Sequence, residues 1–288
     1  MKYVLESVFR FICVVIGLIL LSAFVGLFLN GLQLDIGIFV KNIVHITKSL
    51  IFSENLVVIG STGSEYSIFI NYWDYYFYSI IIFLAALFTS ITIGTVLSYF
   101  TIFLPNKINR IIVRTASLLE SLPDLFIIII IQFSVLYYYK QTGTMLFPIL
   151  STSQTKPYLL PIIALALIPS LIVFKIILYL VNEELEKPYI LLAKNKGFGK
   201  SHIFLFHVLR NIVPSIITHS KSVILLQLST MVIFEKLFNI NGIITYLIRF
   251  PEPNVIAFTL IMIYVPIFLF YSLASIFVKN KTGQRLEW

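Results

Sequence analysis

Six long apolar segments, separated by shorter polar or aromatic stretches, dominate the pattern of the chain. They cover approximately residues 7–29, 76–104, 122–139, 158–181, 212–234 and 255–278. A helix of about 20 mostly apolar residues crosses the hydrocarbon core of a bilayer, so each segment predicts one membrane-spanning helix. The third, "LFIIIIIQFSVLYYY", is rich in β-branched residues. We still expect a helix there, because an isolated strand cannot satisfy its backbone in lipid.

The first segment could be read as a cleaved signal peptide. Its apolar part is too long for that, and no clean small-x-small cleavage site follows it, so we expect a retained helix. The composition agrees with a membrane protein, since 59% of the residues are hydrophobic and 12% are charged, against about a quarter charged in soluble domains. The prediction is an all-α integral membrane protein with a single transmembrane domain over residues 1–288.

The basic residues predict the orientation. With the N-terminus inside, the inner segments hold thirteen Lys and Arg residues and the outer segments hold six, while Lys175 and Lys221 lie within apolar segments. Cytoplasmic loops carry the excess of Lys and Arg, so both termini are predicted to be cytoplasmic. The net charge of +8 then reflects these loops and does not indicate nucleic-acid binding. The single cysteine, Cys13, cannot form an internal disulfide.

The longest connection, residues 30–75, is predicted to be extracytoplasmic. Residues 37–52 suit a short helix on the outer face of the membrane. The run "NYWDYYFY" is typical of the aromatic belt at a membrane interface. A ligand-binding aromatic patch is the alternative.

A polar stretch at residues 182–211 separates the fourth and fifth apolar segments. It contains "GFGKS", whose Gly199, Lys200 and Ser201 match the end of a phosphate-binding loop. The first glycine of that motif would fall at position 194, which is Lys194. The segment before it is predicted to be a helix, whereas the motif follows a strand. We therefore expect no nucleotide binding by this chain.

The same stretch predicts a helix-turn-helix elbow. Glu183, Glu184 and Glu186 would lie near the start of a short helix, where the helix dipole favours acids, with Pro188 in its first turn. Gly197 and Gly199 would allow a sharp reversal, and Ser201 would cap a second helix. One side of the first helix is predicted to hold Leu185, Tyr189, Leu192 and Lys196. An amphipathic elbow of this kind suits a groove on another protein.

This elbow resembles the EAA-type cytoplasmic loop of permease subunits of bacterial ABC importers, and more narrowly the oligopeptide, dipeptide and nickel group. A second stretch, "VIFEKLFNINGI", resembles an outer hairpin of the group through Glu235, Phe238 and Gly242. Pro188 and Asn195 depart from the loop pattern, replacing an acid and an alanine. The residues that match the loop in order and spacing are Glu183, Leu185, Tyr189, Ala193, Gly197, His207, Arg210, Asn211 and Pro214.

The resemblance implies a type I importer fold and a role without bond chemistry. It implies a multi-pass protein of the bacterial cytoplasmic (inner) membrane that works by alternating access. The implied partners are a second, similar permease chain, an extracytoplasmic solute-binding protein and two ATPase subunits, which would bind ATP and magnesium while this chain binds no cofactor. Residues 182–211 would form the ATPase-coupling loop, with Lys200 and Arg210 facing acids on the ATPase. The implied substrate is a short peptide or a metal chelate.

Polar residues within the apolar segments are candidates for the translocation path. Gln132, Lys221, Gln227 and Ser229 could line that path, or they could bond between helices or, for Lys221, reach the headgroups. Lys175 could be functional, since charge within a span is costly, but we favour a structural residue that reaches the headgroups. The four histidines lack metal-ligand spacing. A stand-alone secondary transporter or channel is the alternative function, but such proteins place acids in their spans, and we expect no buried carboxylate there.

Overall fold

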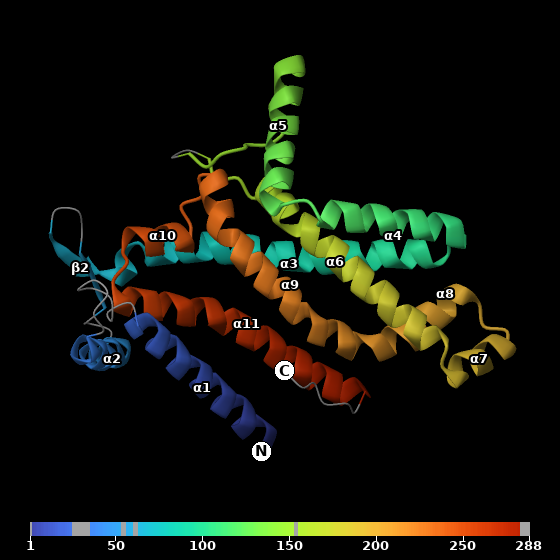
Figure 1. The fold of residues 1–288 in the computed structure, drawn as a ribbon, viewed down its shortest axis with the longest axis horizontal. Helices are drawn as coiled ribbons and strands as arrows, with labels where there is room; N and C mark the ends of the chain where they lie inside the picture. Colours follow the sequence, from blue (N-terminus) through green and yellow to red (C-terminus); the bar gives the residue numbers. More distant parts are fainter. Residues whose placement is uncertain (1, 25–34, 53–55, 60–62, 153–154, 283–288) are drawn as a thin grey trace. The chain divides into compact units, whose positions relative to one another are not determined.

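The computed structural model describes residues 2–24, 35–52, 56–59, 63–152 and 155–282. Within these ranges, six helices are long and apolar enough to cross a membrane, which confirms the predicted fold class (Figure 1). They are α1 (Lys2–Phe24), α3 (Tyr72–Ile102), α5 (Asp124–Thr142), α6 (Leu159–Leu185), α9 (Leu209–Leu237) and α11 (Pro253–Thr282).

Most predicted boundaries lie within a few residues of the observed ones. Part of the first predicted segment, residues 25–29, lies outside the described residues. The fourth spanning helix continues four residues past its predicted end, to Leu185. The fifth differs most at its start. The fifth joins the preceding short helices to form one continuous helix, Lys200–Leu237.

Smaller elements connect the spanning helices. The helix α2 (Ile36–Ile51) confirms the helix expected near residues 37–52, and Asp35 caps it by accepting a hydrogen bond from Ile38 N at 3.0 Å. The sequence did not predict the antiparallel hairpin of β1 (Val57–Ile59) and β2 (Glu65–Ser67), nor the helix α4 (Asn106–Glu120). The remaining elements are η3 (Ile68–Ile70), α4 (Asn106–Glu120), α7 (Pro188–Asn195), α8 (Lys200–His202), the π-helical segment η4 (Ile203–Val208) and α10 (Ile243–Arg249).

The chain forms two compact units. Unit 1 contains Met1–Ile80 and Asn241–Leu273, and unit 2 contains Ile81–Ile240 and Ala274–Trp288. The core of unit 1 is aromatic, with Tyr72 and Tyr246 packed edge to face at 5.3 Å between ring centroids. Two further tyrosines of the predicted interfacial belt, Tyr76 and Tyr78, are also buried. These rings therefore lie inside the protein, because the inward face of α3 packs into the core of unit 1.

Unit 2 is organised around α6, of which more than half is buried. Its most extensive packing is with α9, and it also contacts α4 and α5. Gly94 of α3 lies so close to α6 that a Cβ there would be 2.6 Å from Val173 Cγ1. Ser98 Oγ, one turn later on α3, donates to the Phe174 carbonyl at 3.0 Å. These contacts mark a close crossing of α3 and α6 at Val173 and Phe174.

The helix α5 is attached to unit 2 mainly through its first turns. Ile127 and Ile128 are buried against the other helices, whereas Phe133 and Tyr137 are two-thirds exposed. Figure 1 shows α5 (green) diverging from α6 and α9. Much of its apolar surface therefore faces away from the helices of its own unit.

Candidate functional site

The backbone of the predicted elbow follows from two residues. Pro188 begins α7, as predicted, and Lys187 before it is extended with ψ 144, since a residue that precedes proline avoids the helical region. Gly197 makes the reversal after α7 with φ +84, a conformation that glycine adopts without strain. The predicted cap of the second helix is wrong, because that helix begins at Lys200 with Gly199 at the cap position.

The acidic residues lie at the end of α6 and do not open the following helix. Because Pro188 prevents α7 from starting earlier, α6 runs through Glu183 and Glu184 and ends at Leu185. The placement predicted for these acids is therefore wrong. Glu183 is exposed, whereas Glu184 is 5% exposed. The two neighbours thus face different surroundings.

Glu184 is the centre of a hydrogen-bond network that joins three elements. Its carboxylate accepts from Lys187 Nζ at 2.5 Å, from the Tyr189 hydroxyl, and from Asn211 Nδ2 at 3.3 Å. Asn211 Nδ2 also donates to the Tyr189 hydroxyl oxygen at 2.8 Å. A buried carboxylate is tolerated when paired and hydrogen-bonded in this way. The network fixes α7 against the end of α6 and the start of α9.

The network also changes the acidity of Tyr189. Burial, and then the hydrogen bond to the Glu184 carboxylate, raise the pKa of Tyr189 to about 12, because both disfavour the phenolate. The hydroxyl therefore remains protonated at neutral pH. It can act as a permanent donor to the carboxylate.

The elbow has an inner and an outer face. Ile190 and Ala193, three residues apart on α7, are buried, so the predicted coupling residue Ala193 packs inward. Leu191, Leu192 and Phe198 are 53%, 62% and 43% exposed. Tyr189 and Leu192 are also three residues apart on α7 and lie on one side of it, as predicted, whereas Leu185 ends α6 and does not belong to this helix. The exposed cations around this apolar surface are Lys194, Lys196 and Lys200.

The remaining predicted elbow residues lie around this core. Leu185 is half-buried, and Arg210 is exposed in the first turn of α9. His207 lies in the π-helical segment η4, its ring 5.9 Å from Phe198 and 5.8 Å from His202. His202 in turn stacks on Phe198 at 4.8 Å. These rings make an aromatic cluster beside the turn at Gly197.

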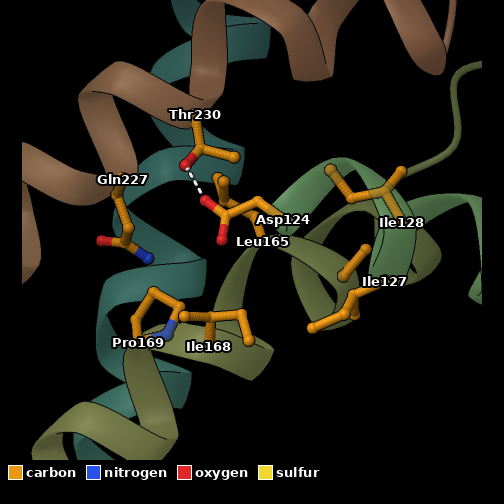
Figure 2. Close-up of a pocket in the computed structure, with 9 residues that line it drawn as sticks. Asp124, Ile127, Ile128, Leu165, Ile168, Pro169, Gln227 and Thr230 are labelled. Carbon is orange, nitrogen blue, oxygen red and sulfur yellow. Dashed lines mark hydrogen bonds between the residues drawn. The ribbon is translucent and has the colours of Figure 1, made fainter. Parts of the chain in front are cut away.

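A small polar pocket lies between α5, α6 and α9, far along the chain from the elbow. It has a volume of about 10 Å³ and is lined by Asp124, Gln227 and Thr230 among apolar groups that include Leu165 and Pro169. The Thr230 hydroxyl donates to the Asp124 carboxylate. Figure 2 shows this bond, and it shows the Gln227 amide nitrogen on the side of the pocket that Asp124 and Pro169 border. Gln227 is fully buried.

The sequence identified Gln227 but not Asp124 or Thr230. The available signal for Asp124 was an acid in the first turn of a spanning helix, directly after Pro123. The other predicted path residues lie elsewhere. Gln132 Nε2 donates to the Leu237 carbonyl at 3.0 Å, and the exposed Ser229 bonds within its own helix. Lys221 is half-buried and has no hydrogen-bond or ion-pair partner in the described part of the chain.

One expectation about charge in the spanning helices is wrong, namely that they hold no buried carboxylate. Lys175, predicted to be structural, forms an ion pair with Glu120 of α4 at 2.6 Å. Carboxylates do lie within these helices, since Glu235 of α9 is 1% exposed and Asp124 lines the pocket. The absence of buried acids therefore cannot be used to choose between classes of transporter.

Comparison with known proteins decides between those classes. The profile of the family described as binding-protein-dependent transport system inner membrane component matches residues 90–280, which include both the elbow and the pocket. The chain belongs to this family. It is therefore a multi-pass, inner-membrane permease component of a binding-protein-dependent transport system, which decides against the stand-alone carrier.

A narrower likeness concerns one relative of this permease. The dipeptide transport system permease protein DppB of Lactococcus lactis subsp. cremoris (strain MG1363) is 33% identical over 98 residues. That alignment covers 34% of this chain and 32% of the relative. The permease thus matches about a third of the length of this curated relative.

Proposed function

We propose that this permease carries short peptides across the membrane and that two separate ATPase subunits drive it through the elbow. In this proposal, a solute-binding protein delivers the peptide to the outer face, a second and similar permease chain completes the path, and ATP and magnesium bind to the ATPase subunits. Family membership supports the transport role. The name of the dipeptide permease, similar over 98 residues, supports the choice of peptides.

The network at Glu184 is the observation that carries the coupling proposal. A surface that transmits force must keep its shape under load, and Glu184 ties α7 to α6 and α9 through Lys187, Tyr189 and Asn211. The same network leaves Leu191, Leu192 and Phe198 exposed. A short apolar helix face with basic residues around it suits a hydrophobic groove with an acidic rim on a partner. Lys200, exposed beside this face, is the proposed contact with the acidic rim.

Photocrosslinking in the assembled importer tests the docking surface. A photoreactive phenylalanine at Leu192 should capture an ATPase subunit, whereas the same group at Met145, exposed in the connection between α5 and α6, should not. Capture of lipid or of the second permease from Leu192 would contradict the proposal. In liposomes, uptake of a labelled dipeptide should require ATP and the ATPase subunits. Uptake by the purified permease alone would also contradict it.

A further inference from the structure

We propose that the pocket between α5, α6 and α9 is a binding site for one structural water molecule. The pocket is about 10 Å³, which is close to the smallest space that holds a single water. Its walls combine apolar side chains with Asp124, Gln227 and Thr230. Size and polarity therefore both match a water and exclude a solute of peptide size.

The polar groups at the pocket need such a partner. Both the nitrogen and the oxygen of the Gln227 amide are buried and have no hydrogen-bond partner among the described residues, although Gln227 is fully buried. Leaving a buried amide unpaired is costly, and in a spanning helix no bulk water relieves that cost. A water in the pocket would accept from the Gln227 nitrogen and donate to the Asp124 carboxylate, which already accepts from Thr230 on another side.

The helix α6 supplies a further acceptor. Pro169 lies inside α6 and has no N–H, so the carbonyl of Leu165, four residues earlier, lacks its usual helical donor. Leu165 and Pro169 both line the pocket. A water there would bond to the freed carbonyl as well as to Gln227 and Asp124. Buried waters typically make about three such bonds.

The water would lie beside Pro169, where α6 lacks one backbone hydrogen bond. After Pro169, α6 is held by Gly94 and Ser98 of α3 and by the ion pair of Lys175 with Glu120. Before Pro169, it borders the pocket with Asp124 and Gln227. A water can exchange its bonds when the angle between the two parts changes, whereas a direct side-chain bond would fix that angle.

The direction in which Gln227→Met shifts the melting midpoint tests whether a water occupies this site. Gln227→Met keeps the length of the side chain and removes its polar atoms. If a water binds there, the variant loses that water's donor and the melting midpoint of the assembled importer should fall by about 2–6 °C. If the pocket is dry, the same change removes an unpaired amide and the midpoint should rise. A rise would overturn the proposal.

A double-mutant cycle that combines Gln227→Met with Pro169→Ala gives a second test, again measured as the melting midpoint. Alanine restores the N–H that bonds to the Leu165 carbonyl, so the destabilisation by Gln227→Met should be at most half as large in that background. Gln132→Met is the matched control, because Gln132 bonds directly to Leu237 and its effect should be the same in both backgrounds. Equal effects of Gln227→Met in both backgrounds would contradict the water.

Two further readouts separate a water from an ion. Cryo-electron microscopy of the assembled importer at high resolution should show a single density peak within hydrogen-bond distance of Gln227 and Asp124. The midpoints in sodium, potassium and choline chloride should agree within error. A midpoint that rises with one cation and loses that dependence in Asp124→Asn would assign the site to that cation instead.

Discussion

Gly197 gives the sharpest test of the elbow as a mechanical contact. Its φ of +84 lies in the left-handed region, and a Cβ built on it meets nothing within 4 Å. A substitution there therefore costs backbone strain and no steric clash. That strain is about 1–2 kcal/mol for a residue with a Cβ, and it is greatest for a β-branched side chain. Gly197→Val should thus disfavour the native turn roughly 5–30-fold.

The assay is ATP-driven dipeptide uptake by the importer reconstituted in liposomes, with ATP hydrolysis measured in parallel. We expect Gly197→Val to reach the membrane in normal amounts but to lose at least half of its uptake per ATP. Gly199→Val is the matched control. Gly199 has φ −66 and equally open surroundings, so valine there should be tolerated. Equal uptake per ATP in the two variants would refute the reasoning.

Three other predictions follow from contacts in unit 2. Lys175→Met should lower the melting midpoint, because the Glu120 carboxylate loses its partner, and adding Glu120→Gln should recover most of the loss. Gly94→Ala should cost about 1–3 kcal/mol by overpacking. Val173→Ala should rescue it only in part, since backbone also lies within 3 Å of the new Cβ. Finally, the absorbance of tyrosinate at high pH, wild type minus Tyr189→Phe, should show a midpoint near pH 12. The stability from this raised pKa is fully present below about pH 10 and is lost as the pH rises towards 12. A midpoint near pH 10 would place Tyr189 outside the network.

The spanning helices could be predicted because their signal is local. Each needs only about 20 consecutive apolar residues, and even the β-branched third segment is helical. The helix α4 gives no such signal, because Asn106, Lys107, Arg110 and Arg114 keep its sequence polar. The hairpin pairs strands of three residues, such as Val57–Ile59. Strands this short form because of tertiary packing more than because of the β-propensity of their residues.

The candidate sites could be predicted from the sequence only at residues whose type alone determines the backbone conformation. Pro188 and Gly197 act this way, and both were placed correctly. The choice of Glu184 over Glu183 depends on where α6 ends, which a neighbouring pair of acids does not reveal. The pocket joins Asp124 to Thr230 across 106 residues, and no spacing in the sequence predicts that contact.

The helix that leaves the elbow continues unbroken from Lys200 to Leu237, over 38 residues. Each residue in a helix advances the angle of the next by about 100°. Inserting one residue between Asn211 and Gln227 would leave the Glu184 network in place but swing Gln227 and Thr230 away from the pocket. The number of residues between Asn211 and Gln227 therefore fixes the orientation of the pocket residues relative to the Glu184 network. Natural length variation should avoid this stretch and gather in the connections between helices.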